Sequence, residues 1–320
     1  MTIIRFGYVA MSMNLQHASP SQTMTHKQFS GLKDEEAAIR KLERIAVSNI
    51  ENCLRLLKHN VLHDIHFFRF SSKLIPLANH PDLAGWDFLT PLLPALGEIR
   101  SYLREHPMRV DFHPDHFVLL NSTDPQVMKN SLKTLRMHEG ILDAMGIDPL
   151  HRCVLHVGGA HGDKEKAMEQ FIHNWGLTPE GIQRMIMLEN DDTVFSAFDA
   201  LYLCEKLGIP LVFDLHHHMA NEERDWTLDW TRVVATWKDS PLPLKMHISS
   251  PRSADDFKAH ADYIDPHDFL GFLRRVEGSV DRIDCMIEAK QKDNALFKLM
   301  EELVQEEGVR RVDGSTIEIG

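Results

Sequence analysis

Cysteine is scarce in this chain, and its spacing excludes a protein stabilised by disulfides. The 320 residues contain four cysteines, Cys53, Cys153, Cys204 and Cys285, which lie far apart and inside apolar segments. No Cys-x-x-Cys spacing occurs, so nothing indicates the disulfide framework of a secreted domain. We expect all four to be small core residues.

Long hydrophobic runs are also absent. No apolar stretch is long enough to span a bilayer, and the N-terminus passes into a strand-like segment, Ile3–Gly7, without a signal-peptide pattern. Hydrophobic residues still make up 43% of the chain and charged residues 26%, which is the balance of a globular protein with an ample core. We therefore expect a cytoplasmic protein that does not bind membranes.

Two familiar catalytic motifs are missing. The segment Val157–Gly162 is rich in glycine but lacks the Lys-Ser/Thr of a phosphate-binding P-loop, and no Gly-x-Ser-x-Gly nucleophile elbow occurs. Positive charge is in deficit as well. The net charge of −12 argues against a protein that coats nucleic acid nonspecifically, whereas an acidic pocket suits the binding of cations.

Histidine, in contrast, is abundant, with 20 residues in the chain. The stretch Pro210–Met219 begins as a short apolar strand and ends in the run Asp214–His218, which contains three adjacent histidines. Imidazole nitrogens and carboxylate oxygens are the donors that hold ions such as zinc and manganese. Such a run could equally form a solvated loop, but the same succession of apolar strand and ligand-type residue recurs along the chain.

Strand-like and helix-like segments alternate through the sequence. The expected strands are Ile3–Val9, His63–Phe70, Met108–His113, Arg152–Val157, Met185–Glu189, Leu211–Asp214, Leu244–Ile248 and Ile283–Ala289. The expected helices are Ser30–His59, Trp86–Glu105, Pro125–Met145, Lys164–Trp175, Thr193–Leu207, Leu228–Trp237, Pro266–Val276 and Asp293–Glu307. This alternation predicts an α/β fold, a (β/α)8 TIM barrel with its active site at the C-terminal ends of the strands. A doubly wound open sheet is the alternative, because alternation alone cannot show closure.

No change of composition divides the chain, so we expect residues 1–320 to form a single domain. The polar tail, at about residues 309–320, is expected to be loosely held. Four further histidines are interpreted as surface residues: His17, His26, His138 and His173.

Residues with ligand or catalytic chemistry occur at or just after each expected strand. They are Tyr8; Arg69 with Ser71 and Ser72; His113; His156; Glu189 with Asn190; Asp214 and His217; Lys245 and His247; and Glu288 with Lys290. In a barrel these strand ends meet on one face. One such residue is more often a cap or a solvent-facing side chain, but a series at consecutive strand ends is hard to attribute to chance. Because a glutamate can bridge two cations, the residues indicate a multi-metal hydrolase or isomerase, and do not choose between them.

A set of short motifs, taken in order, resembles the UV damage endonuclease family, which is related to the endonuclease IV metal barrels. The motifs are Phe6-Gly7-Tyr8, Arg69-Phe70-Ser71-Ser72, His113-Pro114-Asp115-His116-Phe117, His156-Val157-Gly158-Gly159, Leu188-Glu189-Asn190-Asp191, Asp214-Leu215-His216-His217, Lys245-Met246-His247 and Ile287-Glu288-Ala289-Lys290. Each motif is modest alone. The ordered set is specific and covers the chain from Phe6 to about Leu299.

This resemblance implies a metal-dependent DNA repair endonuclease. Such an enzyme would nick duplex DNA immediately 5′ of UV photoproducts, such as cyclobutane dimers and 6-4 products. It would use a cluster of three divalent ions, with manganese expected first and zinc, cobalt or magnesium as alternatives. Its partner would be damaged double-stranded DNA, and we expect a monomer without a protein partner.

The resemblance also implies a metal ligand set that is centred on Glu189, which would bridge two ions. The remaining ligands form three sets: His113 and His156, with His80 nearby; Asp214, His247 and Glu288; and His217 with His260. His80 could instead cap the loop before Pro81, and His260 lies in a polar stretch where a surface histidine is nearly as common.

Four other residues receive roles by the same resemblance. Lys245 matches a lysine that is carboxylated in the family, and Tyr8 matches an active-site tyrosine near the scissile phosphate. His116 and Phe117 match a pair that wedges into the duplex at the lesion, although some members carry Gln-Tyr at this place.

Two other functions remain open at this point. A sugar isomerase of the xylose isomerase type shares a barrel with Glu, Asp and His ligands, but it would lack a duplex wedge such as His116-Phe117. A noncatalytic metal-binding damage sensor is the second, and an intact ligand set argues against it. For DNA binding we expect a basic rim around an acidic pit, formed by Arg69, Lys73, Lys164, Lys166, Arg252, Lys290 and Lys292.

Overall fold

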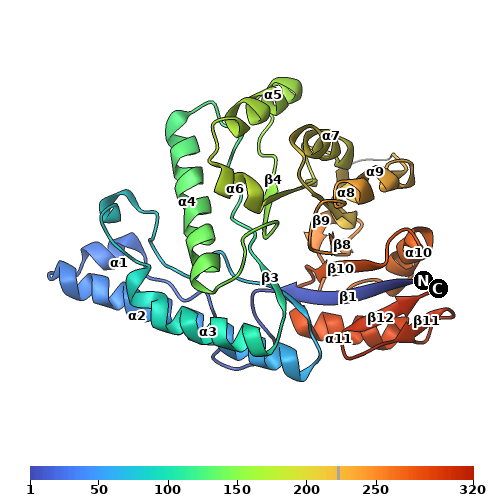
Figure 1. The fold of residues 1–320 in the computed structure, drawn as a ribbon, viewed down its shortest axis with the longest axis horizontal. Coiled ribbons are helices and arrows are strands. Elements are labelled where there is room, and N and C mark those ends of the chain that lie inside the picture. Colours follow the sequence, from blue (N-terminus) through green and yellow to red (C-terminus); the bar gives the residue numbers. More distant parts are fainter. Residues whose placement is uncertain (222–223) are drawn as a thin grey trace.

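Parallel strands form a nearly closed barrel in the computed structural model, which describes residues 1–221 and 224–320 (Figure 1). The strands are β1 (Thr2–Val9), β2 (Phe67–Arg69), β3 (Arg109–Asp111), β4 (Cys153–His156), β5 (Ile186–Glu189), β6 (Leu211–Asp214), β7 (Leu244–Ile248) and β10 (Arg282–Ile287). The path β1-β10-β7-β6-β5-β4 continues on the other side of β1 through β2 to β3. A parallel bridge from Phe112 to Cys153 then joins the end of β3 to β4. The barrel prediction is therefore confirmed, and the open sheet is wrong.

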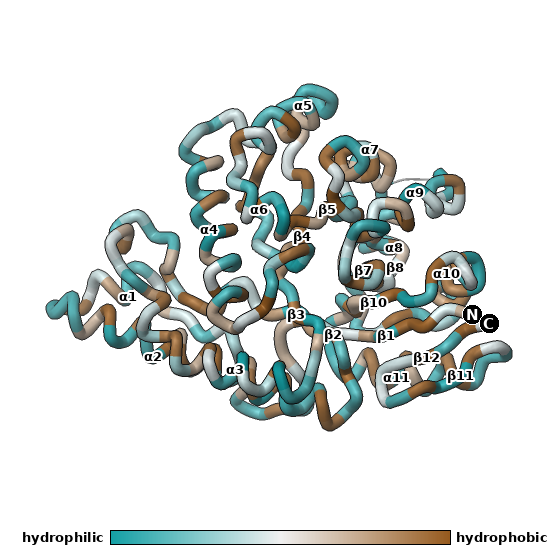
Figure 2. The backbone as a smooth tube through the Cα atoms, in the orientation of Figure 1, coloured by the Kyte–Doolittle hydropathy of each residue, from teal (hydrophilic) through white to brown (hydrophobic). Residues whose placement is uncertain are grey.

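Helices cover the outside of the barrel. They are α1 (His26–Ser30), α2 (Glu35–Leu62), α3 (Leu93–Glu105), α4 (Pro125–Ala144), α5 (Lys164–Trp175), α6 (Glu180–Met185), α7 (Ala197–Leu207), α8 (Leu215–Asn221), α9 (Trp230–Ala235), α10 (Pro266–Val276) and α11 (Lys292–Leu303), with short 3-10 turns η1 (Pro81–Leu83), η2 (Thr90–Leu92) and η3 (Trp226–Leu228). Hydrophobic and hydrophilic residues alternate along most of these helices in Figure 2, as they must where one face packs on the sheet. Aspartate side chains cap the first turns of α2, α4, α5 and α10, which fixes where these helices begin. No helix of the described residues is both long and apolar enough to cross a membrane.

The C-terminal tail is not loosely held. It forms β11 (Val309–Arg311) and β12 (Thr316–Ile319), and β12 pairs antiparallel with β1. Figure 1 shows that the two chain ends consequently lie side by side. Ile317 and Ile319 are buried, at 0% and 3% exposure, so the alternation within this short segment supplies an apolar face. A second hairpin, β8 (Pro251–Ser253) with β9 (Asp256–His260), was also not expected from the sequence.

The barrel interior contains paired charged side chains. Asp284 accepts two hydrogen bonds from Arg5, at 2.7 and 2.9 Å, and one from Arg109 at 2.8 Å. Such buried charges are tolerated because each is paired and hydrogen-bonded. At Gly7 the wall of β1 approaches β2 so closely that a Cβ would overlap the carbonyl oxygen of Phe67. This contact explains why glycine occupies the middle of the Phe-Gly-Tyr motif.

One of the histidines expected at the surface belongs to the core. His138, on α4, is only 1% exposed, and its ring lies against that of Phe112, with 4.6 Å between the centroids. Burial lowers its pKa to about 4, so the ring is neutral at physiological pH. The burial of His138 could not be predicted, because one polar residue on a long amphipathic helix carries little information about its own orientation.

Candidate metal centre

Glu189, the last residue of β5, lies at the centre of a cluster at the C-terminal ends of the strands. Its carboxylate is 1% exposed. Oε2 is 2.8 Å from His113 Nε2 and 3.8 Å from His156 Nε2, whereas Oε1 is 2.9 Å from His247 Nδ1. His113 follows β3 and His156 ends β4, so neighbouring strands deliver both rings to one carboxylate oxygen.

A second group uses the other side of Glu189. Asp214 ends β6, His247 lies in β7 and Glu288 follows β10, and one donor atom of each lies within 4.8 Å of the others. His247 Nδ1 is 3.3 Å from Glu288 Oε1. Arg69, at the end of β2, forms an ion pair with the same Glu288 oxygen. The Arg69 guanidinium therefore holds the Glu288 carboxylate at the edge of the cluster.

His217 is the third element of the cluster. Its Nδ1 is 3.4 Å from Glu189 Oε1 and 3.7 Å from Asp214 Oδ2. The three adjacent histidines lie in helix α8 and not in the solvated loop that was the alternative. The turn of the helix directs His217 to the cluster, whereas His216 Nε2 contacts the carbonyl of Phe257 at 2.7 Å.

His260, at the end of β9, completes this side of the cluster. Its ring centroid is 6.2 Å from that of His217, and its Nδ1 is 2.9 Å from the backbone carbonyl of Glu288. The unexpected hairpin β8–β9 thus brings His260, a predicted ligand, close to His217 and Glu288.

The carboxylates of the cluster repel one another, so a positive charge placed among them would be stabilised. Burial and two neighbouring carboxylates, Glu189 and Glu288, raise the pKa of Asp214 to about 6. Burial alone would lower the pKa of His217, but the facing Asp214 and Glu189 carboxylates outweigh it and raise the pKa to about 11. A proton on His217 supplies part of the positive charge that a metal ion would bring. Carboxylates this close to one another cannot all stay ionised without such a charge.

Three buried nitrogen or oxygen atoms of the cluster also lack a hydrogen-bond partner among the described residues. They are Asp214 Oδ2, His247 Nε2 and His156 Nδ1. Buried polar atoms are nearly always satisfied, so unpartnered atoms on three side chains of one cluster indicate a missing partner. With histidine nitrogens and carboxylate oxygens as donors, the residues present fit divalent metal ions.

Asn190 is a supporting residue of the cluster whose part could not be assigned from sequence. Its side chain donates to the Asp214 carbonyl and accepts from the Asp214 backbone N–H, both at 2.9 Å. The side-chain amide of Asn190 thus pairs with the backbone of Asp214 as a neighbouring strand would. This pairing fixes Asp214 beside Glu189. In the sequence, Asn190 was grouped with Glu189 at a strand end, without a role of its own.

Lys245 lies inside the barrel, two residues before His247 on the same strand. It is fully buried, and its Nζ donates to Asp111 Oδ2 at 2.7 Å. Burial lowers its pKa to about 8, against the attraction of Asp111. The role of Asp111, at the end of β3, was not predicted. Asp111 precedes the His113 motif and lies within a segment whose pattern predicts only a strand.

Tyr8 lies outside the group around Glu189, and its expected place near the scissile phosphate stays a prediction. Its side chain is fully buried, and its hydroxyl is 2.7 Å from Asn60 Oδ1 in α2. Alternation along β1 explains this position, because Arg5 and Gly7 face the barrel interior whereas Tyr8 faces the helix layer.

His80 is also not brought to Glu189. It caps η1, where its Nδ1 accepts the backbone N–H of Asp82 at 3.3 Å, so the capping interpretation is the one that the structure bears out. The described residues that could hold an ion with it are His26 and Asp82, and not His113 or His156.

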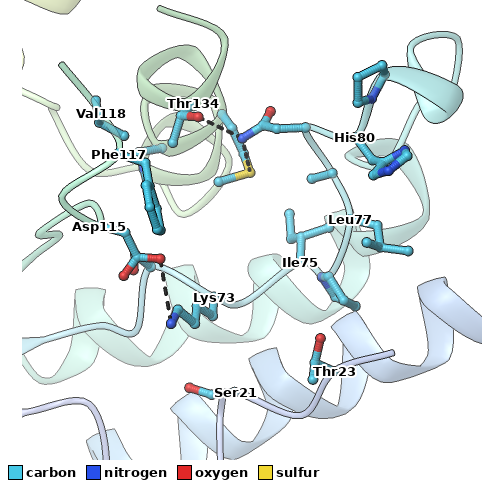
Figure 3. Close-up of a pocket in the computed structure, with 17 residues that line it drawn as sticks. Ser21, Thr23, Lys73, Ile75, Leu77, His80, Asp115, Phe117, Val118 and Thr134 are labelled. Atoms are coloured by element: carbon cyan, nitrogen blue, oxygen red, sulfur yellow. Dashed lines mark hydrogen bonds and ion pairs between the residues drawn. The ribbon is translucent and has the colours of Figure 1, made fainter. Parts of the chain in front are cut away.

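His116 and Phe117 lie on an exposed loop between β3 and α4. Their rings contact each other at a centroid distance of 4.0 Å, and Phe117 is 72% exposed. The loop separates two cavities. One of about 500 Å3 includes His116, His156, His217 and His260 in its lining, and one of about 660 Å3 includes Phe117, Lys73 and His80. Figure 3 shows the second cavity, with Phe117 above Asp115 at one end and His80 at the other.

The expected basic rim is largely neutralised within the chain. Arg69, Lys73, Lys164, Lys166 and Arg252 form ion pairs with Glu288, Asp115, Asp199, Asp163 and Asp256. A phosphate group would therefore have to compete with a carboxylate for most of these cations.

A TIM barrel whose strand ends carry a shared glutamate among histidines and carboxylates belongs to the class of metal-binding barrel enzymes. The family described as UV-endonuclease UvdE matches residues 4–319. A UV DNA damage endonuclease of Halalkalibacterium halodurans is 51% identical over 317 residues, which is 98% of each chain. This chain belongs to the UvdE family and is a DNA repair endonuclease.

The fold agrees with this assignment. The crystal structure of SacUVDE superposes with a TM-score of 0.82 at 31% identity, covering 94% of this chain and 98% of that one. Endonuclease IV from Thermus thermophilus gives a TM-score of 0.52 at 13% identity, with 94% and 99% of the two chains covered. The latter likeness shows a common barrel and nothing about activity.

Proposed function

We propose that this endonuclease nicks duplex DNA immediately 5′ of UV photoproducts, including cyclobutane dimers and 6-4 products, at a three-metal centre. The observation that carries the proposal is the position of Glu189, whose two oxygens face different histidines, so that one carboxylate could serve two ions. Family membership supports a lesion in UV-damaged DNA as the substrate. The same membership leaves no support for the sugar isomerase or the noncatalytic sensor.

The ligand assignment follows the three groups of the cluster. His113 and His156 would hold one ion, Asp214, His247 and Glu288 a second, and His217 with His260 a third, with Glu189 shared by the first two. When bound, divalent ions polarise a phosphodiester, lower the pKa of a water molecule and stabilise the leaving oxygen. Manganese is the metal that we propose, with zinc, cobalt and magnesium as alternatives to be tested.

Several residues of the chain would hold this centre in its working geometry. Arg69 keeps the Glu288 carboxylate in place, and Asn190 does the same for Asp214. Outer partners of this kind orient ligands and tune the affinity for metal. The 1% exposure of Glu189 keeps bulk water away, which strengthens the interaction of the ligands with any cation.

We also propose that Lys245 carries a carbamate in the active enzyme. A pKa lowered to about 8 by burial leaves part of the amine neutral, and the neutral amine is the form that reacts with carbon dioxide. The product retains an N–H for Asp111 and removes a positive charge close to His247. Native mass spectrometry at neutral pH would show the added carbon dioxide, whereas a bare amine in the metal-loaded protein would refute this assignment.

For lesion recognition we propose that His116 and Phe117 enter the duplex. A photoproduct weakens stacking and pairing, so a duplex that contains one costs less to kink and open. The exposure of Phe117 and its place on the loop after His113 support this role, because opening would then be coupled to the metal centre. We propose that the enzyme acts as a cytoplasmic monomer.

The experiment that tests the proposal is cleavage of a duplex with one defined photoproduct, labelled at each end in turn. The expected product is a single nick at the phosphodiester immediately 5′ of the lesion, which appears with manganese and disappears with a chelator. A nick elsewhere, or equal cleavage of the undamaged duplex, would refute the proposed specificity.

A further inference from the structure

One cation of the expected basic rim has no carboxylate partner although it lies close to the metal centre. Lys292 is the first residue of α11, which begins soon after Glu288 at the end of β10. Its side chain is partly exposed, and it forms no ion pair within the part of the chain that the structure describes. The charged groups that act on its ammonium are Arg69 and Glu288, which places it on the Glu288 side of the cluster.

The backbone of Lys292 adopts an unfavourable conformation. Its φ of 51° lies in the left-handed region, which residues with a side chain rarely adopt. Glycine is the residue that occupies this region without a steric cost. Strain of this kind persists only where surrounding contacts impose it, and strained residues concentrate at functional sites.

Hydrogen bonds on the N-terminal side impose part of this conformation. The backbone N–H of Lys290 donates to the carbonyl of Ala261 at 3.0 Å, and that of Gln291 donates to the carbonyl of Asp262 at 3.1 Å. Ala261 and Asp262 directly follow β9, the strand that carries His260. The residues before Lys292 are therefore fixed to the segment that bears a predicted metal ligand.

Asp293 fixes the chain on the other side of Lys292. Its side chain is fully buried, and its carboxylate accepts hydrogen bonds from the loop that follows β1. The donors are Met13 N–H at 2.8 Å, Asn14 Nδ2 at 3.0 Å and the Ser12 hydroxyl. Lys292 thus lies between two anchored residues, so its position relative to the cluster is set before any substrate binds.

The positive charge of Lys292 is poorly compensated within the chain. Burial lowers the pKa of its ammonium, Arg69 lowers it further, and Glu288 offsets only part of this effect. Glu288 already forms an ion pair with Arg69. A partly buried cation without an anion of its own favours an anionic ligand, and for a DNA endonuclease that anion is a backbone phosphate.

We propose that Lys292 binds a phosphate of the DNA backbone on the Glu288 side of the metal centre. This inference rests on the proposed position of the scissile bond at the Glu189 cluster. The ammonium would donate to a nonbridging phosphate oxygen and hold the strand in place without reading its sequence. Because the contact is made equally in the ground state and the transition state, it should lower KM and leave kcat unchanged.

The salt dependence of nicking tests this contact. Wild type, Lys292→Gln and Lys206→Gln are compared on a duplex with one cyclobutane dimer, with manganese, over a series of salt concentrations. Lys206 is an exposed lysine in the last turn of α7 and serves as the matched control, because its loss changes the net charge equally. The KM of Lys292→Gln should rise about tenfold at unchanged kcat and metal content, as for the loss of one hydrogen bond to a charged group. Its plot of log kcat/KM against log salt concentration should become shallower by about 0.9, the value for one phosphate contact.

Replacement by glycine separates binding from stability. Lys292→Gly removes the charge and also the backbone strain, so its Tm should equal or exceed that of wild type while its KM rises as in Lys292→Gln. A lower Tm at unchanged KM would assign Lys292 a structural role and refute the proposal.

Two further outcomes would overturn the contact. One is a salt dependence of Lys292→Gln that equals that of wild type, and the other is an equal change in Lys206→Gln, which would show an effect of net charge alone. If wild type leaves the duplex uncut, the proposed function fails, and the same comparison is then made on the dissociation constant of the uncut complex. There too, equal salt slopes for Lys292→Gln and wild type would refute the contact, and a slope lower by about 0.9 would support it.

Discussion

Arg69 is a residue whose role differs from the one expected at first. It was assigned to a DNA-binding rim, but its guanidinium is 12% exposed and forms an ion pair with Glu288. Burial would raise the pKa of Glu288, and Arg69 together with His247 more than offsets this effect and keeps the pKa well below its usual range. The glutamate is therefore held ionised, as a metal ligand must be.

Replacing Arg69 with glutamine should weaken metal binding without unfolding the protein. We expect the affinity for manganese to fall roughly ten- to a hundredfold, as for other outer partners of metal ligands. Titration calorimetry with manganese measures this effect. Arg252→Gln, which removes an exposed cation paired with Asp256, is the control and should leave the affinity unchanged; equal affinities for Arg69→Gln and wild type would show that Glu288 needs no support.

His138 provides a pH-dependent test of the core. Its folded pKa is about 4, lowered by burial, whereas an unfolded histidine titrates near 6.5. The unfolded state therefore binds the proton first, so stability is fully present above about pH 6.5 and is lost as the pH falls towards 4. The loss from this residue should be roughly 3 kcal/mol.

Urea unfolding of wild type and His138→Gln between pH 7 and pH 4 measures this loss. The variant should show a flatter dependence of unfolding free energy on pH, while His173→Gln, which changes an exposed histidine, should follow wild type. Identical slopes for His138→Gln and wild type would mean that His138 titrates normally in the folded protein.

Sequence reasoning at this scale identified which side chains follow the strand ends, but not the direction in which the pleat of a strand turns each one. His113, His156, Glu189 and Asp214 lie together because parallel strands end on one face. Tyr8 occupies a comparable position in its motif, yet the pleat of β1 turns it into the helix layer. The ion pair of Lys245 with Asp111 joins β7 to β3, two strands that are not neighbours in the barrel, so no pattern within either motif indicates it.

The C-terminal strand β12 is the element that sequence reasoning misjudged most. A short polar tail with four apolar residues resembles loose chain, and no local pattern reveals that β1 offers it an edge. Its pairing with β1 runs from Thr2 opposite Ile319 to Arg5 opposite Thr316. The hairpin β8–β9 was missed for the same reason, since its strands pair with each other over only a few residues.

Truncation of Ile317 tests the importance of this strand. Ile317→Ala removes a fully buried side chain and should lower the unfolding free energy by about 2–4 kcal/mol. Glu318→Ala, on the opposite face of the same strand, should cost less than about 1 kcal/mol, because it removes only an exposed ion pair with Arg310. Equal effects of the two changes in urea unfolding would mean that β12 is not packed on the core.

The loop between β3 and α4 is the element proposed to sense damage. The double variant His116→Ala and Phe117→Ala should leave metal content unchanged, since neither residue belongs to the ligand groups. Incision of duplex DNA with a cyclobutane dimer should fall sharply, because a stacking contact worth roughly 1–3 kcal/mol per base is lost. Gel assays with single-lesion duplexes measure the rates.

A duplex with an abasic site distinguishes wedging from general positioning. It is already distorted, so less work of opening remains and the double variant should lose less activity on it. Equal losses on both substrates would assign the pair to positioning the backbone, and unchanged rates on both would remove it from the mechanism.

At the scale of the whole molecule, the barrel concentrates charges that the chain could not otherwise tolerate. The net charge is −12, and cations near the strand ends are largely paired with acids of the same chain. An acidic pit with few free cations around it favours the binding of metal ions. We propose that metal ions at the pit also help to draw in the DNA backbone, so that the cluster would serve binding as well as chemistry.

The overall architecture was the most predictable feature of the protein. Regular alternation of apolar strands and amphipathic helices required only the hydrophobic periodicity of the chain, which is a strong signal over long segments. Closure of the barrel depended on the single bridge between Phe112 and Cys153, and no local pattern could have shown it. The placement of His80 depended in turn on how the segments around α1 and η1 pack outside the barrel.

The most direct test of the central claim is the activity of Glu189→Gln on a duplex with one cyclobutane dimer, measured over a series of manganese concentrations. Glutamine keeps the shape of the side chain and removes the charge that two ions would share. Wild type should nick the duplex 5′ of the dimer in a manganese-dependent manner, whereas Glu189→Gln should be almost inactive at every concentration, with an unchanged circular dichroism spectrum. Incision by Glu189→Gln at the wild-type rate and at low manganese would contradict the shared-glutamate metal centre.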